Sequence, residues 1–338
     1  MKKTFIHLIA GSALTLSALS AFAADYTLKI QSSDPSGDQN FMVQKAWADK
    51  VKKDSKGKLE IELLPVGSVV KHTETLDSIK MGVLDGHLTA TGYFSGKDPA
   101  FGLLGNMVGA WSDTSQLLDY MNNGGGNALL TELYKPYGVK FVGASTTGVE
   151  SFVSKVPLDG VDDLKGLKLR APEGLVQQVF AAAGAAPVNL PGSEVFTGLS
   201  KGVIDAADYT VFSTNHKNGL NDIAPHPVQP GFHSLPLIDM SISQKKWDEL
   251  PEDLQTLLVQ SVKDLAIDMT TKLKKADEKA VEEAKKNPKI TIHDWSAEER
   301  KKFRAIAQTQ WEKFAGRSPN AKKVYDSVTG YLKEKGLL

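Results

Sequence analysis

Apolar and polar residues alternate along two early segments of the chain. Residues 26–30 and 58–63 place every second side chain on one face, which is the pattern of half-buried β-strands. Between them, a segment that begins near Asp38 and ends at about Ser55 carries apolar residues at helical spacing. A helix at about 73–81 and a strand at about 86–91 follow. This alternation of strands and helices favours a parallel or mixed sheet covered by helices.

The later part of the chain also contains both predicted helices and predicted strands. Gly124–Gly126 interrupt a helical pattern and predict a break between two helices. The segment 225–236 carries four prolines and is expected to be an irregular connector. The other predicted elements are strands at 139–144, 149–153 and 167–170, a helical turn at 162–166, and helices at about 173–183, 251–286, 296–315 and 319–335.

One pattern occurs twice. Glu74-x7-Gly82-Val83-Leu84-Asp85 returns 120 positions later as Glu194-x7-Gly202-Val203-Ile204-Asp205, and a Pro/Gly loop precedes each copy. Each copy predicts a loop, a helix, a glycine C-cap and a strand, which we call the repeated unit. Two similar α/β halves imply two lobes with a cleft between them. The alternative is a chance match, because helix–strand patterns recur in many chains.

The first 23 residues have the features of a secretory signal. Lys2 and Lys3 precede an apolar run from Phe5 to Leu19, and Ala21-Phe22-Ala23 forms a small-x-small cleavage site. We therefore expect residues 1–23 to be removed and the mature, periplasmic protein to begin at Ala24.

Composition narrows the classes of function. The chain has no cysteine, which excludes disulfides and thiolate metal sites. The chain has 40 Lys and Arg residues in total and 40 Asp and Glu residues in total, so its formal net charge is zero. Loss of Lys2 and Lys3 with the signal leaves a formal charge of about −2. This balance argues against nucleic acid as a partner and against electrostatic adsorption to anionic lipid.

The common catalytic signatures are incomplete. Residues 143–147 lack the last glycine of a nucleophile elbow, and residues 92–98 lack the spacing and the hydroxyl of a phosphate loop. The histidines after residue 23 show no close metal-ligand spacing, and no His-Glu-x-x-His occurs. An exported hydrolase or lyase acting on an organic acid remains the rival class to a binding protein.

Three further motifs resemble one family. The segment Asp163–Pro172 reads Asp-Leu-Lys-Gly-Leu-Lys-Leu-Arg-Ala-Pro, the second copy of the repeated unit follows it, and Leu250-Pro251 opens a long helix. In this order they resemble the solute-binding proteins of tripartite ATP-independent periplasmic (TRAP) transporters. The resemblance covers essentially the whole chain after the signal, and it implies a binding protein rather than an enzyme.

The resemblance implies an α/β, two-lobed periplasmic-binding-protein fold with mixed sheets, hinge strands and a long connecting helix. Lobe I is expected at 24–147, with 237–338 returning to it, and lobe II at 148–236. Strands near 145–153 and 236–243 would cross between them. The lobes would close on a small organic acid anion and deliver it to the membrane subunits of the transporter.

The resemblance places the ligand-binding arginine of the family at Arg170. A guanidinium is planar and permanently charged, and it matches a carboxylate with two parallel hydrogen bonds. Arg170 ends a predicted strand, where its side chain can leave the sheet for a cleft. The alternatives are an ordinary surface arginine and a core ion pair.

More of the chain resembles the branch that binds 2-oxo acids and lactate. The segments 93–101 and 230–233 are similar to its aromatic-Gly-Lys-x-Pro and Pro-Gly-Trp-His segments. The same resemblance makes Asp208 and Asp239 candidate ligands of a cation, Na⁺ or Ca²⁺, that bridges the bound acid. Tyr93 and Tyr209 become candidate cleft walls.

Three differences from the pattern of this branch involve four residues. The two acids are Asp rather than Glu, Tyr209 replaces a tryptophan, and Thr147 stands where a glutamine is expected. Thr147 and Asn215 are further polar candidates for the site. Alternative roles are the orientation of Arg170 for the two acids and simple core packing for the tyrosines.

The identity of the acid stays open at this stage. One arginine can pair with the acidic group of many ligands, among them a 2-oxo acid, lactate, a C4-dicarboxylate, a sugar acid and a sulfonate. A sensor that presents its ligand to a receptor is a further alternative. The C-terminal segment 324–338 could pack inside the chain or form a homodimer.

Overall fold

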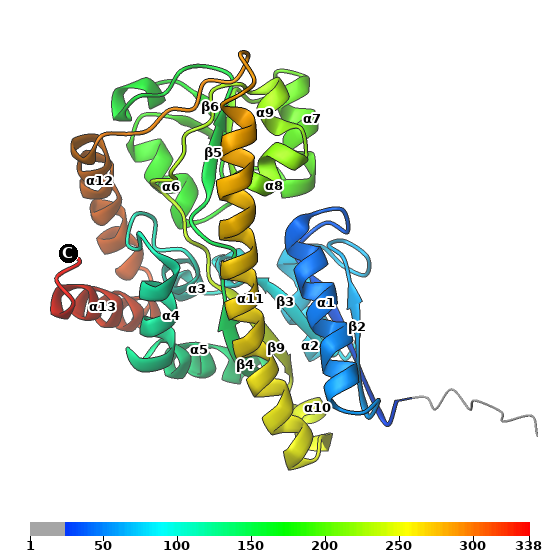
Figure 1. Cartoon of the computed structure of the whole chain (residues 1–338). Coiled ribbons are helices and arrows are strands. Elements are labelled where there is room, and N and C mark those ends of the chain that lie inside the picture. Colours follow the sequence, from blue (N-terminus) through cyan, green and yellow to red (C-terminus); the bar gives the residue numbers. More distant parts are fainter. Residues whose placement is uncertain (1–23) are drawn as a thin grey trace, which may run out of the picture.

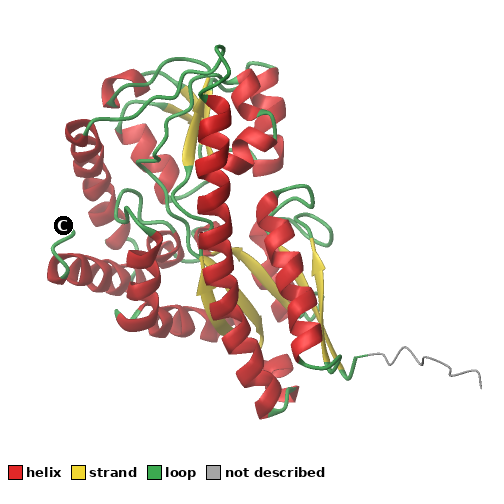
Figure 2. Ribbon diagram, viewed as in Figure 1, coloured by secondary structure: helices red, strands yellow, loops and turns green. Residues whose placement is uncertain are grey.

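The computed structural model describes residues 24–338 and contains two β-sheets with helices packed around them (Figure 1, Figure 2). The expected signal segment, residues 1–23, lies outside the described residues. The strands are β1 Tyr26–Ser32, β2 Leu59–Leu64, β3 Gly86–Ala90, β4 Val139–Ser145, β5 Ser151–Ser154, β6 Lys168–Arg170, β7 Ala186–Val188, β8 Ala206–Thr210 and β9 Ile238–Ser243.

Thirteen α-helices occur in the described residues, and together with the strands they confirm the α/β class. They are α1 Gln39–Asp54, α2 Thr75–Lys80, α3 Pro99–Gly105, α4 Thr114–Asn123, α5 Gly126–Tyr134, α6 Leu175–Ala182, α7 Val195–Ser200, α8 Phe212–Lys217, α9 Leu220–Ile223, α10 Gln244–Glu249, α11 Glu252–Ala284, α12 Ala297–Ala315 and α13 Pro319–Glu334.

Both sheets are mixed, as expected. The first has the order β2-β1-β3-β9-β4, in which β1 pairs in parallel with β2 and β3, and β9 runs antiparallel between β3 and β4. The second has the order β5-β8-β6-β7, in which β6 pairs in parallel with β7 and β8, while β5 is antiparallel to β8. Parallel strands end at the same edge of their sheet, so β1 and β3 of one sheet, and β6 and β8 of the other, each send their following loops to one edge.

The repeated unit folds the same way twice. Gly82 and Gly202 end α2 and α7 with φ of 73° and 72°, a left-handed conformation that glycine adopts at little cost. The next residues then form matching bonds: Asp85 N–H donates to Lys29 O over 2.9 Å, and Asp205 N–H donates to Lys168 O over 2.7 Å. Each unit therefore docks its strand, β3 or β8, beside the strand that lies two strands earlier in the chain, β1 or β6.

Two connections cross between the sheets side by side. Residues 146–150 lead from β4 to β5, and the proline-rich connector 224–237 leads back to β9. The Glu150 N–H donates to Ser234 O over 2.9 Å, which joins the two connections. The crossing expected near 236–243 lies just before β9, because β9 itself belongs to the first sheet.

Helix α11 runs along both halves of the molecule (Figure 1). On the side of the first sheet, Trp47 Nε1 of α1 donates to Ser261 Oγ over 3.1 Å. On the side of the second sheet, the Ser213 N–H of α8 donates to Asp277 Oδ1 over 2.7 Å. The long connecting helix is therefore attached to both halves.

The C-terminal helices pack inside the chain. Helix α12 contacts α6 and α3, and α13 contacts α3, α5 and α12. The apolar residues Val324, Val328 and Leu332 of α13 are buried by these contacts. This packing uses the apolar face that could otherwise have served a homodimer. In residues 24–338, we find no helix with the length and apolar character needed to cross a membrane.

Candidate functional site

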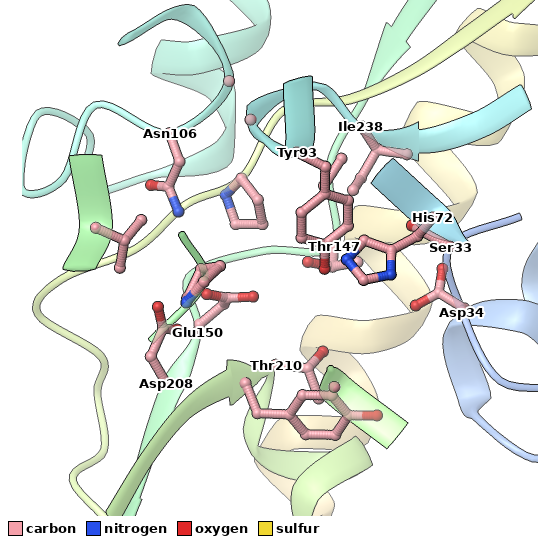
Figure 3. A pocket seen from close by; sticks show the side chains of 18 of the residues that line it. Ser33, Asp34, His72, Tyr93, Asn106, Thr147, Glu150, Asp208, Thr210 and Ile238 are labelled. Carbon is pink, nitrogen blue, oxygen red and sulfur yellow. The ribbon is translucent and has the colours of Figure 1, made fainter. Parts of the chain in front are cut away.

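A cleft lies between the two sheets, and the space between its walls, including space open to solvent, is about 990 Å³ (Figure 3). Its walls come from the loops that follow β1, β3 and β6, from the end of β8, and from the crossing segment 146–150. Ligands of open α/β sheets bind at the carboxyl ends of strands, so this location agrees with the topology. Arg170, Tyr93, Thr147, Asp208 and Tyr209 line the cleft, whereas Asp239 and Asn215 do not.

The guanidinium of Arg170 is held rigidly at the end of β6. Its Nε donates to Leu190 O over 3.0 Å, and its Nη1 donates to Asp208 O over 2.5 Å. The residue is only 4% exposed. A guanidinium has five N–H groups, and these two bonds leave others available to the cleft. A carboxylate can therefore be bound without reorganising the side chain.

Arg170 has a counterpart in the first sheet. Since Ile30 pairs with Gly86 and Leu169 pairs with Ala206, Gln31 occupies the position in β1 that Arg170 occupies in β6. Gln31 Nε2 donates to Val70 O over 2.8 Å, which corresponds to the bond from Arg170 to Leu190. The repeated unit therefore extends further than the sequence pattern showed, and it includes the arginine.

A buried group of ionisable side chains lies beside Arg170. Ligand atoms of Glu150, Asp208 and His233 lie within 4.8 Å of one another. His233 Nε2 is 3.1 Å from Asp208 Oδ1, and Ser234 Oγ is 3.4 Å from Asp208 Oδ2. All four residues are at most 8% exposed. Sequence reasoning missed Glu150, although the position directly before strand β5 on the expected crossing segment was a usable signal.

The pKa values of the two carboxyls in this group are shifted in opposite directions. Burial, followed by the negative charge of Asp208, raises the pKa of Glu150 well above its ordinary value of 4.5. Burial also opposes ionisation of Asp208, but the contacts with His233 and the charge of Arg170 outweigh it and lower the pKa of Asp208. Without a cation, these surroundings favour the protonated form of Glu150 and the charged form of Asp208.

Asp239 lies away from the cleft, which corrects the expectation that it pairs with Asp208. Successive residues of a strand face opposite sides, and Ile238 is the neighbour that lines the cleft. Asp239 is fully buried in the first half, where it accepts hydrogen bonds from Thr91, Tyr134 and Ser241. The structure does not bring the two predicted cation ligands together.

Asn215 is also a structural residue. It is fully buried in α8, and its Nδ2 donates to Thr210 O over 2.8 Å and to Ser151 O over 3.2 Å. These bonds fasten α8 to the ends of β8 and β5. The expectation that Asn215 contacts the ligand does not match this placement.

Tyr93 and Thr147 lie in the middle of the cleft. Burial raises the pKa of Tyr93, and the charges of Arg170, Glu150, Asp34 and Asp208 all reach its hydroxyl. Thr147 is 4% exposed, and its Oγ1 has no hydrogen-bond partner in the described part of the chain. Both residues line the cleft, as expected, although the Thr147 hydroxyl itself is buried.

The loop after β1 supplies a second group that sequence reasoning missed. Asp34 is half-buried and lines the cleft, and Asp38 and Asn40 lie beside it. Asp38 stands at the N-terminal cap position of α1, as expected, but its side chain forms no capping bond. The carboxyl end of a predicted parallel strand was the signal that could have identified Asp34.

The side chains of this loop reach across the cleft to the second half. Tyr209 Oη donates to Asp38 Oδ2 over 3.1 Å, and Asn218 Nδ2 donates to Asp38 Oδ1 over 2.8 Å. Asn40 Nδ2 donates to Thr210 Oγ1 over 3.2 Å. These bonds hold the two walls of the cleft together in this structure.

Comparison with known proteins identifies one family. A family model described as "Bacterial extracellular solute-binding protein, family 7" matches residues 32–317. A monocarboxylate 2-oxoacid-binding periplasmic protein of Nostoc sp. is 29% identical over 231 residues, which cover 68% of this chain and 63% of that protein. The chain therefore matches less than two thirds of that relative's length.

Two solved structures are also similar. A TRAP periplasmic solute-binding protein of Rhodobacter sphaeroides, in an apo open form, is 57% identical, with a TM-score of 0.76 and coverage of 92% of this chain and 99% of that one. One from Pseudoalteromonas atlantica, with bound sodium and pyruvate, is 26% identical, with a TM-score of 0.81 and coverage of 92% and 95%.

Proposed function

Because the chain belongs to the bacterial extracellular solute-binding proteins of family 7, which serve TRAP transporters, we propose that it captures a small organic acid anion by lobe closure and delivers it to the membrane subunits. Members of this family bind solutes and are not enzymes, so the hydrolase or lyase alternative is set aside. The rigid guanidinium of Arg170 in the cleft is the observation that carries the proposal. The signal segment would direct export and would be cleaved before Ala24.

A thermal-shift screen of small anions tests this function. The set contains 2-oxo acids, lactate, C4-dicarboxylates, sugar acids and sulfonates. A ligand at 100 times its dissociation constant stabilises the folded protein by about 2.7 kcal/mol. We expect at least one acid to raise the melting temperature clearly. If no acid raises it, the proposal is contradicted.

Closure of the lobes is supported by two observations. The hydrogen bonds of Asp38 and Asn40 join the walls across the cleft. In addition, the pyruvate-bound relative at 26% identity superposes better than the open relative at 57% identity, with TM-scores of 0.81 and 0.76. The arrangement seen here resembles a bound state more than an open one.

Tyr209→Phe is expected to weaken the closed state while keeping the aromatic wall. The change removes the hydrogen bond to the Asp38 carboxylate, and bonds to charged groups contribute about 1.5–3 kcal/mol. Calorimetry should show affinity lower by roughly 10-fold or more, and X-ray scattering should show a larger radius with ligand than in the wild type. Tyr26→Phe, on β1 away from the cleft, is the control. Unchanged affinity and scattering would show that this bond does not hold the lobes.

We further propose that Glu150 and Asp208 hold a cation that bridges the ligand. Two buried carboxylates with the Ser234 hydroxyl nearby form an oxygen-rich donor set suited to Na⁺ or Ca²⁺. The raised pKa of Glu150 supports the assignment, because a carboxyl that is costly to charge alone becomes favourable beside a cation. The cation would also offset the negative charge that faces an incoming acid.

Removal of the cation is therefore expected to weaken binding. In sodium-free buffer with a calcium chelator, the wild-type affinity should fall about tenfold or more, measured by calorimetry. Glu150→Gln should have low affinity in both buffers and little response to the cation, since an amide cannot neutralise the ion. Asp222→Asn, an exposed acid of the same half, should behave like the wild type. If the affinity does not change when sodium is removed and chelator is added, the two carboxyls do not hold a cation. Glu150 is then a protonated partner of Asp208.

A further inference from the structure

The far end of the cleft carries an acid that the proposed function does not use. Asp34 follows β1 directly, and its carboxylate is held in place by Asn40 Nδ2 at 3.2 Å and by Gln44 Nε2 at 2.6 Å. It forms no ion pair with any residue in the described range 24–338. A carboxylate has about four acceptor sites, so two of them remain available on a side chain that borders the cavity.

The two groups of acids lie at opposite ends of the same cavity. In the view of Figure 3, Glu150 and Asp208 are on the left, and Ser33, His72 and Asp34 are on the right, with Tyr93 and Thr147 between them. Arg170 belongs to the left-hand group through its bond to Asp208 O. A ligand whose carboxylate binds Arg170 therefore extends past Tyr93 and Thr147 towards Asp34.

The charges of the cleft do not suit an anion that carries acceptors alone. Its lining includes the carboxyls of Asp34, Asp38, Glu150, Glu173 and Asp208, against the single guanidinium of Arg170 and the imidazole of His72. A cation between Glu150 and Asp208 offsets the first group only. At the other end, an anionic tail would meet the charge of Asp34, and an apolar tail would displace water from its remaining acceptor sites, and both cost free energy.

We infer that the ligand carries a hydrogen-bond donor, a hydroxyl or an ammonium group, at the end opposite its carboxylate, and that Asp34 accepts this bond. This inference rests on the proposed function, because it assumes that Arg170 binds the carboxylate. It makes Asp34 a specificity-determining residue and excludes short unsubstituted acids as the best ligands.

The titration of Asp34 supports this role. Burial raises the pKa of Asp34 from 3.8 to about 6, against the hydrogen bonds from Asn40 and Gln44. The carboxylate is therefore charged and a strong acceptor at neutral pH, and it takes up a proton below pH 6. An ammonium tail should lose affinity as the pH falls through 6, whereas a hydroxyl tail should lose less, because it can also accept a bond from the protonated acid.

Matched acids test the inference. Calorimetry compares unsubstituted, ω-hydroxy and ω-amino acids of the same length, between about four and six carbons, with pyruvate as the short reference. At one or more lengths, the hydroxy or amino acid should bind about tenfold or more tightly than its unsubstituted counterpart, the size expected for a bond to a charged group. Measurement at pH 5 and pH 8 then separates the ammonium from the hydroxyl tail.

Asp34→Asn should reduce the preference for the donor-bearing acid to within about twofold, because the amide is a weaker, uncharged acceptor. Asp49→Asn, an exposed acid on α1, should keep the preference. If pyruvate or an unsubstituted acid binds at least as tightly as every acid with a hydroxyl or amino group at its far end, the inference is wrong. The proposed function is then unaffected. Failure of all these acids, pyruvate included, would also overturn the inference, and the proposed function would fall with it only if every anion of the thermal-shift screen failed too.

Discussion

Arg170→Met is expected to weaken binding of the acid by roughly 30-fold to several thousand-fold. The loss of one partner of a buried charge pair costs about 2–5 kcal/mol, and each 1.4 kcal/mol is a factor of ten. Arg170 is 4% exposed and two of its N–H groups already bond the backbone, so the charge is fixed before the ligand arrives. Calorimetry with an acid identified in the anion screen measures the effect.

Two variants make the result specific. Arg170→Lys should also bind poorly, because an ammonium cannot form the paired contact or the bond to Leu190 O. Lys168→Met removes a positive charge from an exposed position of the same strand and should leave affinity within about twofold. Circular dichroism should show that all three variants fold. If a folded Arg170→Met protein binds with wild-type affinity, Arg170 does not bind the ligand.

Asp239→Ala should destabilise the fold by about 3–5 kcal/mol, the usual cost of removing one partner from a buried ionic network. The carboxylate accepts bonds from Thr91 Oγ1 and Ser241 Oγ at 2.6 Å and from Tyr134 Oη at 3.0 Å, and His87 Nε2 lies 3.2 Å away. Its removal leaves these groups buried without an acceptor. Urea denaturation should give a lower midpoint with an unchanged slope.

The same variant separates a structural role from a binding role. Protein that remains folded at low temperature should bind the acid with nearly wild-type affinity, because Asp239 does not border the cleft. Asp248→Asn, an exposed acid on α10, should change neither property. Normal stability combined with lost binding would instead support the cation-ligand role that the sequence suggested.

The sequence predicted most of the architecture because its signals are local. The alternation at 58–63, the glycines at 124–126 and the proline-rich connector each depend on neighbouring residues alone, and the structure confirms all three. Arg170 was identifiable because it lies in a distinctive motif at a strand end. Asp208 was named through the family resemblance, but Glu150 and His233 were not, because they lie on the two crossing connections and meet Asp208 only in the folded chain.

Asp239 shows the limit of a sequence pattern. Strand β9 is buried on both faces, so its residues carry no polar–apolar alternation that would reveal which of them face the cleft. A shift of one position moves a side chain to the opposite face, and Ile238 rather than Asp239 lines the cleft. Asp34 was overlooked for another reason, because a short polar stretch before a helix is usually explained by capping.

Gln31 and Arg170 occupy equivalent positions in the two copies of the repeated unit. Gln31 uses its amide within its own loop, donating to Val70 O and accepting from the N–H groups of Val69 and Val70. Arg170 keeps the corresponding bond to Leu190 O and has further donors available. Only one of the two equivalent positions therefore offers a charged donor, so the proposed capture would begin on the wall that carries Arg170, and closure of the opposite wall would follow.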